Sequence, residues 1–194
     1  MQTPPPPPWT LSLEGLVWLH RAVPEAARFH QPGLRFDRGI PVTVGGFARY
    51  VDSPVGAYSE VWGSPTLVVR RRSVSLAVPF MAVDSAASLR GGRANWALPK
   101  VPAAFGPDRW AASGDGWSLL ARVLSAGPRI PLLATGHLLQ AREDGALLRS
   151  RCIARGAGRP ARVLVDGEPP AWLAPGRHLG LVVDRATLVV RAPG

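Results

Sequence analysis

The chain has 194 residues, of which 46% are hydrophobic and 19% charged. This is enough for one globular domain with a sizeable core, and it excludes a mainly disordered chain. The net charge of +10 comes from scattered arginines, so we expect a solvated surface and no nucleic-acid partner. No apolar run approaches the roughly 20 residues that span a bilayer, and the N-terminus lacks the features of a secretory signal. We therefore expect a cytoplasmic protein with no membrane partner.

The first half of the chain predicts short strands between turns. A flexible proline-rich tail is predicted over residues 1–8, followed by a single domain over 9–194. A short helix is predicted over 24–29. Strands are predicted from the apolar runs at 16–21, 40–50, 58–62, 66–69 and 73–83. The last two of these runs flank three consecutive arginines and predict a hairpin.

The segment before Lys100 breaks this pattern. Asp84 and Ser85 can cap a helix whose first turn is residues 86–89. Two glycines weaken that helix, and Pro99 ends the segment. Lys100 would then occupy an ordered but irregular position, which suits a functional residue.

The second half shows short apolar runs separated by turn signals. Asp-Gly pairs tolerate the positive φ angles of tight hairpin turns. Turns are predicted at Asp115-Gly116, Asp144-Gly145, Asp166-Gly167 and Asp184-Arg185. Short antiparallel strands at this spacing predict a mainly β domain, either a barrel or a sandwich.

Lys100 is the only lysine among 23 basic residues. Arginine can replace lysine as a surface cation, but its guanidinium stays protonated and cannot act as an amine nucleophile. A lone lysine in an arginine-rich chain is therefore a candidate nucleophile. The four histidines share no ligand spacing, so no metal is expected. The single Cys152 excludes an internal disulfide.

Two sequence blocks resemble the acetoacetate decarboxylase-like family. The first is VPFMAVDSAASLRGGRANWALPK over residues 78–100, and the second is GAYSE over 56–60. Weaker similarity runs from Trp9 to the end. The resemblance implies an antiparallel β-barrel-like fold with a few short helices, a reactive lysine in an apolar cavity, and a homo-oligomer. It implies no cofactor and a small-molecule carbonyl substrate.

The resemblance also implies roles for individual residues. Lys100 matches the lysine that forms a Schiff base, and Glu60 matches a pocket glutamate that could move protons. Candidate substrate-binding residues are Tyr58, Phe80, Met81, Arg93, Trp96, Leu98 and Glu14.

The chain departs from the family pattern at three positions. Val101 stands where the decarboxylase has a second lysine, Glu14 where it has an active-site arginine, and Gly45 where it has a second glutamate. An arginine suits a substrate carboxylate, so its replacement makes acetoacetate itself a doubtful substrate.

Three functions are compatible with these residues. The first is a Schiff-base lyase acting on a β-keto acid or related carbonyl compound, by decarboxylation or a related carbon–carbon step. The second is an aldolase, dehydratase or cyclase of specialised (secondary) metabolism on the same scaffold. The third is a non-catalytic binding protein that kept the fold.

Overall fold

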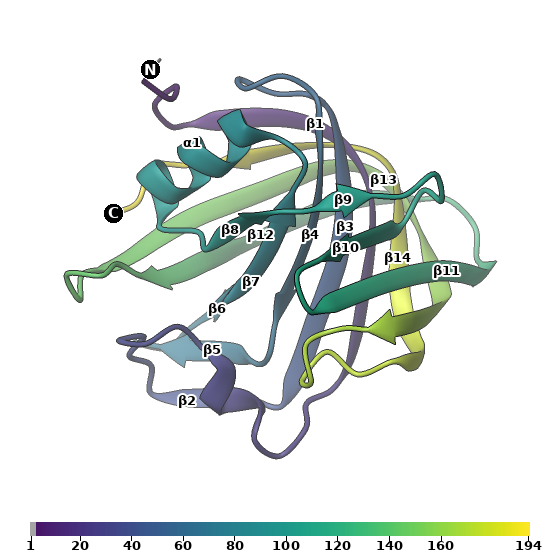
Figure 1. The fold of residues 1–194 in the computed structure, drawn as a ribbon, viewed down its shortest axis with the longest axis horizontal. Helices are drawn as coiled ribbons and strands as arrows, with labels where there is room; N and C mark the ends of the chain where they lie inside the picture. Colours follow the sequence, from purple (N-terminus) through teal and green to yellow (C-terminus); the bar gives the residue numbers. More distant parts are fainter. Residues whose placement is uncertain (1–2) are drawn as a thin grey trace.

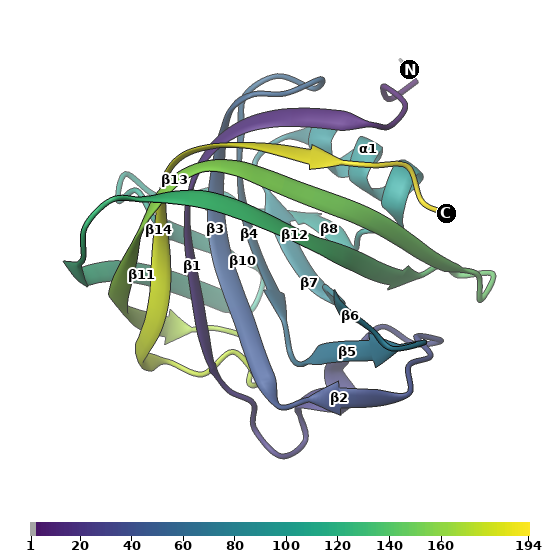
Figure 2. The same ribbon diagram turned by 180° about the vertical axis from the view of Figure 1, so that it is seen from behind.

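The computed structural model describes residues 3–194, and its main feature is one curled sheet of 14 strands. The one α-helix among these residues, α1, lies beside the start of β1 and the C-terminal end of the chain (Figures 1 and 2). The first eight elements in chain order are β1 (Trp9–Arg21), η1 (Ala26–Phe29), β2 (Arg38–Ile40), β3 (Val42–Asp52), β4 (Tyr58–Ser64), β5 (Leu67–Arg70), β6 (Ser73–Leu76) and β7 (Phe80–Val83). The remainder are α1 (Ala86–Trp96), β8 (Lys100–Pro102), β9 (Ala104–Phe105), β10 (Ala111–Gly114), β11 (Trp117–Ala126), β12 (Ile130–Ala141), β13 (Leu147–Glu168) and β14 (Gly176–Val190).

The strands follow the order β2-β5-β6-β12-β13-β14-β1-β3-β4-β7-β8 along the sheet. β11 pairs with the second half of β13, and β10 and β9 continue from it. Pairing is antiparallel except where β12 meets β6 and where β7 meets β8. The prediction of a mainly β, antiparallel fold is therefore confirmed, and the path of this sheet stays open.

Two of the four predicted turns join hairpins. Gly116 and Gly145 have φ angles of 71° and 81° between β10 and β11 and between β12 and β13. The other two predictions, at Asp166-Gly167 and Asp184-Arg185, are wrong, because β13 extends to Glu168 and β14 continues past Asp184-Arg185 with a shift in register. β13 pairs with β12 along its first half and with β11 along its second, so strand pairing outweighs the local turn tendency.

The crossover from β7 through α1 to β8 delivers Lys100 to the sheet. Parallel neighbours need such a crossover, and here α1 supplies it. Ser85 caps the helix by accepting a hydrogen bond from the backbone N–H of Ser88 at 3.2 Å. Ala97 ends it in the left-handed conformation, with φ 52°. The helix thus runs past the predicted first turn and through both glycines.

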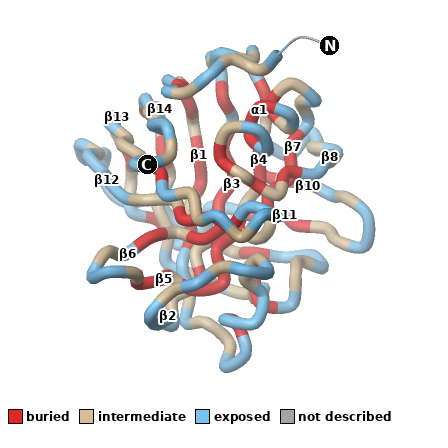
Figure 3. The backbone as a smooth tube through the Cα atoms, turned by 90° about the vertical axis from the view of Figure 1, so that its left-hand side faces the viewer, coloured by how far each residue is buried: buried red, intermediate tan, exposed pale blue. Residues whose placement is uncertain are grey.

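The two largest of three apolar clusters lie inside the curled sheet. One is built around Trp18, Phe47, Trp110, Leu119 and Val163. The other lies towards α1 and is built around Trp9, Tyr50, Tyr58, Met81 and Trp96. In Figure 3 the buried segments gather in β1, β3, β4 and β7, whereas much of β12 is exposed.

The proline-rich tail, as far as it is described, is attached to the helix. The Pro5 carbonyl accepts hydrogen bonds from Trp9 Nε1 at 3.0 Å and from Asn95 Nδ2 at 2.8 Å. The beginning of the predicted tail, residues 1–2, lies outside the described residues. Among residues 3–194, no helix has the length and apolar character needed to cross a membrane.

Candidate active site

Lys100 begins β8 and projects into the space between α1 and the sheet. Its register partner on β7 is Met81. Arg93 of α1 donates a hydrogen bond from Nε to the Lys100 carbonyl at 2.9 Å, which ties the helix to the strand. Gly92 faces the lysine side chain so closely that a Cβ there would lie 2.6 Å from Lys100 Cε. Helix, strand and glycine together set the position of this amine.

The Lys100 amine is held by two polar groups. Its Nζ lies 2.7 Å from Glu60 Oε2 on β4 and 2.8 Å from Ser88 Oγ on α1. The side chains of Lys100 and Glu60 are only 3% and 5% exposed. A buried carboxylate next to a buried amine can accept the proton that the ammonium must lose before it attacks a carbonyl.

Two tyrosines complete the polar end of the site. The Tyr50 hydroxyl donates to Glu60 Oε1 at 3.2 Å, and the Tyr58 ring centroid lies 5.1 Å from Lys100 Nζ. Burial, with the nearby Glu60 carboxylate adding to it, raises the pKa of both phenols above the ordinary value. Hydrogen bonds with Ser88 and Tyr50 oppose this rise in the pKa of Tyr58. Both hydroxyls therefore stay protonated at neutral pH.

A cavity of about 230 Å³ opens at this polar end. Apart from its polar groups, its walls are aromatic and aliphatic side chains from β1, β4, β6, β7, α1, β12 and β14 and from the loops beside them. These are Trp9, Leu11, Trp62, Leu76, Val78, Met81, Trp96, Leu98, Leu138, Leu188 and Val190. An amine at the end of an apolar, partly enclosed cavity is a suitable place for a carbonyl compound to bind and react.

Solved structures of three proteins superpose on almost the whole of this chain. The enduracididine biosynthesis enzyme MppR superposes with a TM-score of 0.67 at 17% identity, over 98% of this chain and 88% of its own. An acetoacetate decarboxylase superposes with a TM-score of 0.67 at 14% identity, over 97% and 88%. An acetoacetate decarboxylase-like enzyme from Sphingomonas wittichii RW1 gives 0.62 at 13% identity, over 96% and 91%. The chain has the acetoacetate decarboxylase-like fold. No protein-family model and no curated protein matches the sequence.

Within this acetoacetate decarboxylase-like fold, six of the nine predicted site residues lie at the cavity. Lys100 and Glu60 are in direct contact, and the walls include Tyr58, Met81, Trp96 and Leu98.

Phe80 and Glu14 lie elsewhere. Neighbouring strand residues point to opposite faces, so Phe80 faces away from the cavity that Met81 lines, and its ring packs edge-on against Trp117 at 5.0 Å. Glu14 is half-exposed and forms an ion pair with Arg109, whereas Trp9 and Leu11 of the same strand line the cavity. The structure therefore places Phe80 and Glu14 outside the walls of the Lys100 cavity.

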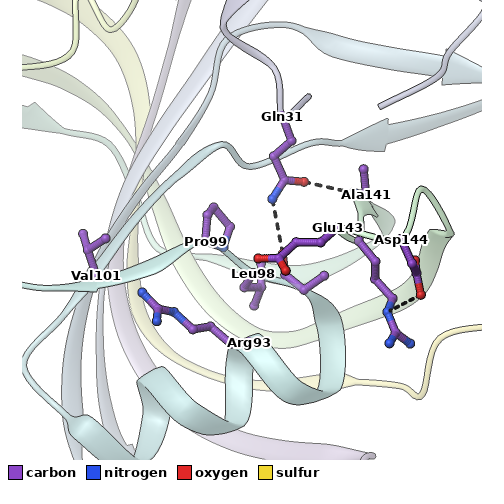
Figure 4. Close-up of a pocket in the computed structure, with 10 residues that line it drawn as sticks. Gln31, Arg93, Leu98, Pro99, Val101, Ala141, Glu143 and Asp144 are labelled. Carbon is purple, nitrogen blue, oxygen red and sulfur yellow. Dashed lines mark hydrogen bonds and ion pairs between the residues drawn. The ribbon is translucent and has the colours of Figure 1, made fainter. Parts of the chain in front are cut away.

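Arg93 lies behind the site. With Gln31, Pro99 and Val101 it lines a surface pocket of about 670 Å³ (Figure 4), and Leu98 lines both this pocket and the cavity. Gln31 holds this wall by donating to the Ala97 carbonyl at 3.2 Å. The Arg93 hydrogen bond to the Lys100 backbone makes it a positioning residue.

Sequence reasoning missed Ser88 and Tyr50. Ser88 was read only as part of a helix turn, although its hydroxyl contacts the amine. Tyr50 sits directly opposite Tyr58 in the β3–β4 register, with the two rings 4.5 Å apart. Aligning the two predicted strands as a hairpin would have placed Tyr50 beside the predicted Glu60. Within residues 3–194, no group of three or more His, Cys, Asp or Glu side chains lies together as metal ligands would.

Removing the Lys100 charge should destabilise the fold. Lys100→Met leaves the Glu60 carboxylate buried without its partner, and breaking a buried pair in this way lowers the free energy of unfolding by about 3–5 kcal/mol. Urea denaturation of the native protein and the variant measures the change. The double variant Lys100→Met/Glu60→Gln carries neither charge and should lose less stability than the single variant. Equal stability of Lys100→Met and the native protein would contradict a buried ion pair.

Proposed function

We propose that the chain is an enzyme that forms a Schiff base between Lys100 and a ketone or aldehyde, and then makes or breaks a carbon–carbon bond next to that carbonyl. The observation that supports it most is the buried contact between the only lysine and Glu60 at the end of an apolar cavity. The acetoacetate decarboxylase-like fold agrees with this chemistry, since proteins named for it share the scaffold.

In the proposed reaction the Lys100 amine adds to the carbonyl carbon, and the carbonyl oxygen leaves as water. The resulting iminium accepts the electron pair released when a bond to the adjacent carbon breaks, which gives an enamine. Glu60 lies 2.7 Å from the amine, where it can take the ammonium proton first and return a proton to the enamine carbon later. Hydrolysis of the iminium then releases the product and restores the lysine.

Two reactions can follow from the same iminium. In a decarboxylase, carbon dioxide leaves from the adjacent carbon. In an aldolase, the enamine instead adds to, or separates from, a second carbonyl compound; in an aldolase-dehydratase, the oxygen of that second carbonyl then leaves as water. MppR, which shares the fold, binds the condensation product of pyruvate and imidazole 4-carboxaldehyde, so the scaffold accommodates a condensation product of two carbonyl compounds in that protein. Measuring carbon dioxide release separates the two.

Covalent trapping tests the proposal. The native protein is incubated with a small β-keto acid or a 1,3-dicarbonyl compound, and borohydride is then added to reduce any iminium to a stable secondary amine. We expect one adduct, which peptide mapping locates at Lys100, because the other candidate amine is the N-terminus. An adduct confined to the N-terminus would contradict the Schiff base and favour a non-catalytic binding protein.

The homo-oligomer implied by the resemblance stays a prediction. Several large apolar side chains are exposed on the curled sheet, among them Leu133 of β12 at 73% and Leu179 of β14 at 54%. A second copy of the chain could cover them. Sedimentation or light scattering measures the oligomeric state.

A further inference from the structure

The charge at the cavity is already balanced before a substrate enters. Of the described residues that line it, only Lys100 and Glu60 carry a formal charge at neutral pH, and they contact each other. Cys152 also lines the cavity, and burial raises its pKa to about 11, so the thiol is neutral. Tyr50 and Tyr58 are neutral for the same reason. The cavity offers a substrate no net positive charge.

A second cation for a substrate carboxylate is missing from these walls. Arg93 donates a hydrogen bond to the Lys100 carbonyl, but its side chain lines the surface pocket and not the cavity. A carboxylate group entering the cavity would lose its water shell among aromatic and aliphatic side chains. It would also approach the Glu60 carboxylate, a like charge.

The walls instead fit a neutral, apolar body. Trp9 and Trp96 pack edge-to-face with ring centroids 4.9 Å apart, and Leu138 of β12 and Leu188 and Val190 of β14 add aliphatic surface to the walls. A volume of about 230 Å³ holds a compound of about ten non-hydrogen atoms, because a water molecule takes up ~30 Å³ of liquid and bonded atoms pack more closely.

We infer that the substrate is a neutral, largely apolar ketone or aldehyde, whose carbonyl meets Lys100 while its hydrocarbon body fills the cavity. This inference rests on the proposed Schiff base and specifies its substrate class. Among the carbon–carbon steps open to the iminium, it selects aldol-type bond making or breaking, because a neutral substrate has no carboxylate to lose.

A matched pair of ketones tests the substrate class. In 6-methylheptan-2-one an isopropyl group stands where 5-oxohexanoate has its carboxylate, so the two compounds share shape and differ in charge. Each is incubated with the native protein and cyanoborohydride, which donates a hydride to the iminium, and the initial rate of adduct formation at Lys100 is measured by mass spectrometry. We expect the neutral ketone to react at least about tenfold faster, since burying an unpaired carboxylate weakens binding by that factor or more.

A charge added to the wall should reverse the preference. Leu188 of β14 lines the cavity and is only half-buried, so an arginine there can reach the cavity while remaining hydrated. Leu188→Arg should raise the adduct rate of 5-oxohexanoate relative to 6-methylheptan-2-one by about tenfold. Leu188→Met changes the side chain without adding charge and should leave the ratio within about twofold of the native one.

The possible outcomes test the substrate class separately from the Schiff base. Equal or faster reaction of 5-oxohexanoate with the native protein overturns the substrate class and leaves the Schiff base standing. Absence of any Lys100 adduct, from these ketones and from the 1,3-dicarbonyl compound alike, overturns the proposed function and this inference with it. Because the comparison of ketones uses the native protein, it holds even if Leu188→Arg fails to fold.

Discussion

Lys100→Arg should abolish covalent trapping of carbonyl compounds while the protein remains folded. The arginine keeps a positive charge next to Glu60, so the buried carboxylate keeps an ionic partner. The guanidinium stays protonated at working pH and has no free amine electron pair with which to attack a carbonyl. Intact-mass analysis after reduction should show only the background of the N-terminal amine, and circular dichroism should show the native β spectrum.

A second variant controls for the loss of the only lysine. Arg122 is exposed on β11 and does not line the cavity. Lys100→Arg/Arg122→Lys restores one lysine to the protein without restoring the buried one. We expect it to remain at background level at short times. Trapping by this double variant at the native rate would show that any lysine suffices and that the cavity contributes nothing.

Glu60→Gln should separate Schiff-base formation from proton transfer. Glutamine has nearly the same shape as glutamate, but its amide cannot accept and return a proton near neutral pH. Exchange of the α-hydrogens of a bound neutral ketone with deuterium oxide should slow by about 10²–10⁴, the usual contribution of a positioned acid–base group. Proton NMR of the ketone signal measures the exchange rate. The adduct at Lys100 should still form at longer incubation times, with solvent taking the ammonium proton in place of Glu60.

Tyr50→Phe is the matched comparison for this variant. It removes the hydroxyl that donates to Glu60 Oε1 but keeps the carboxylate. A hydrogen bond to a charged group contributes about 1.5–3 kcal/mol, so exchange should slow by less than in Glu60→Gln. If Glu60→Gln exchanges deuterium at the native rate, another group moves the proton and Glu60 serves only as the partner of the lysine.

The reactive pair could be found from sequence because its signal is local. Lys100 is the sole lysine and follows a helix cap and a proline within a short block. Glu60 lies in a second short block, and the two meet because β4 pairs with β7, which in turn pairs with β8. Short motifs on neighbouring strands therefore gave the centre of the site.

The cavity walls could not be found in this way, because they depend on contacts far apart in the chain. Leu138, Leu188 and Val190 lie 38 or more positions after the end of the motif at Lys100. Glu14 was misplaced because its position was taken from the resemblance alone, whereas the alternation along β1 puts Trp9 and Leu11 on the cavity face and Glu14 on the other face.

Long-range pairing also explains the two failed turns. Asp166 and Gly167 are paired with Leu120 and Leu119 of β11, so they lie inside a ladder. Asp184 accepts two hydrogen bonds from the Arg159 guanidinium, at 3.1 and 2.9 Å, across the β13–β14 pair. A local tendency to form a turn is overridden where contacts with a neighbouring strand hold the segment extended.

At Gly92, a substitution that would raise the thermal stability of the helix would impair the reactivity of Lys100. Gly92 weakens α1 by about 1 kcal/mol relative to alanine, because glycine loses more backbone freedom in a helix. A methyl group at this position would overlap Cδ and Cε of Lys100, which a Cβ would approach to 2.7 and 2.6 Å. Gly92→Ala, the simplest substitution that would stabilise the helix, would therefore displace the Lys100 amine from its position. Selection for a more stable protein would have to change residues on the exposed side of α1, for example Arg90, and keep glycine at position 92.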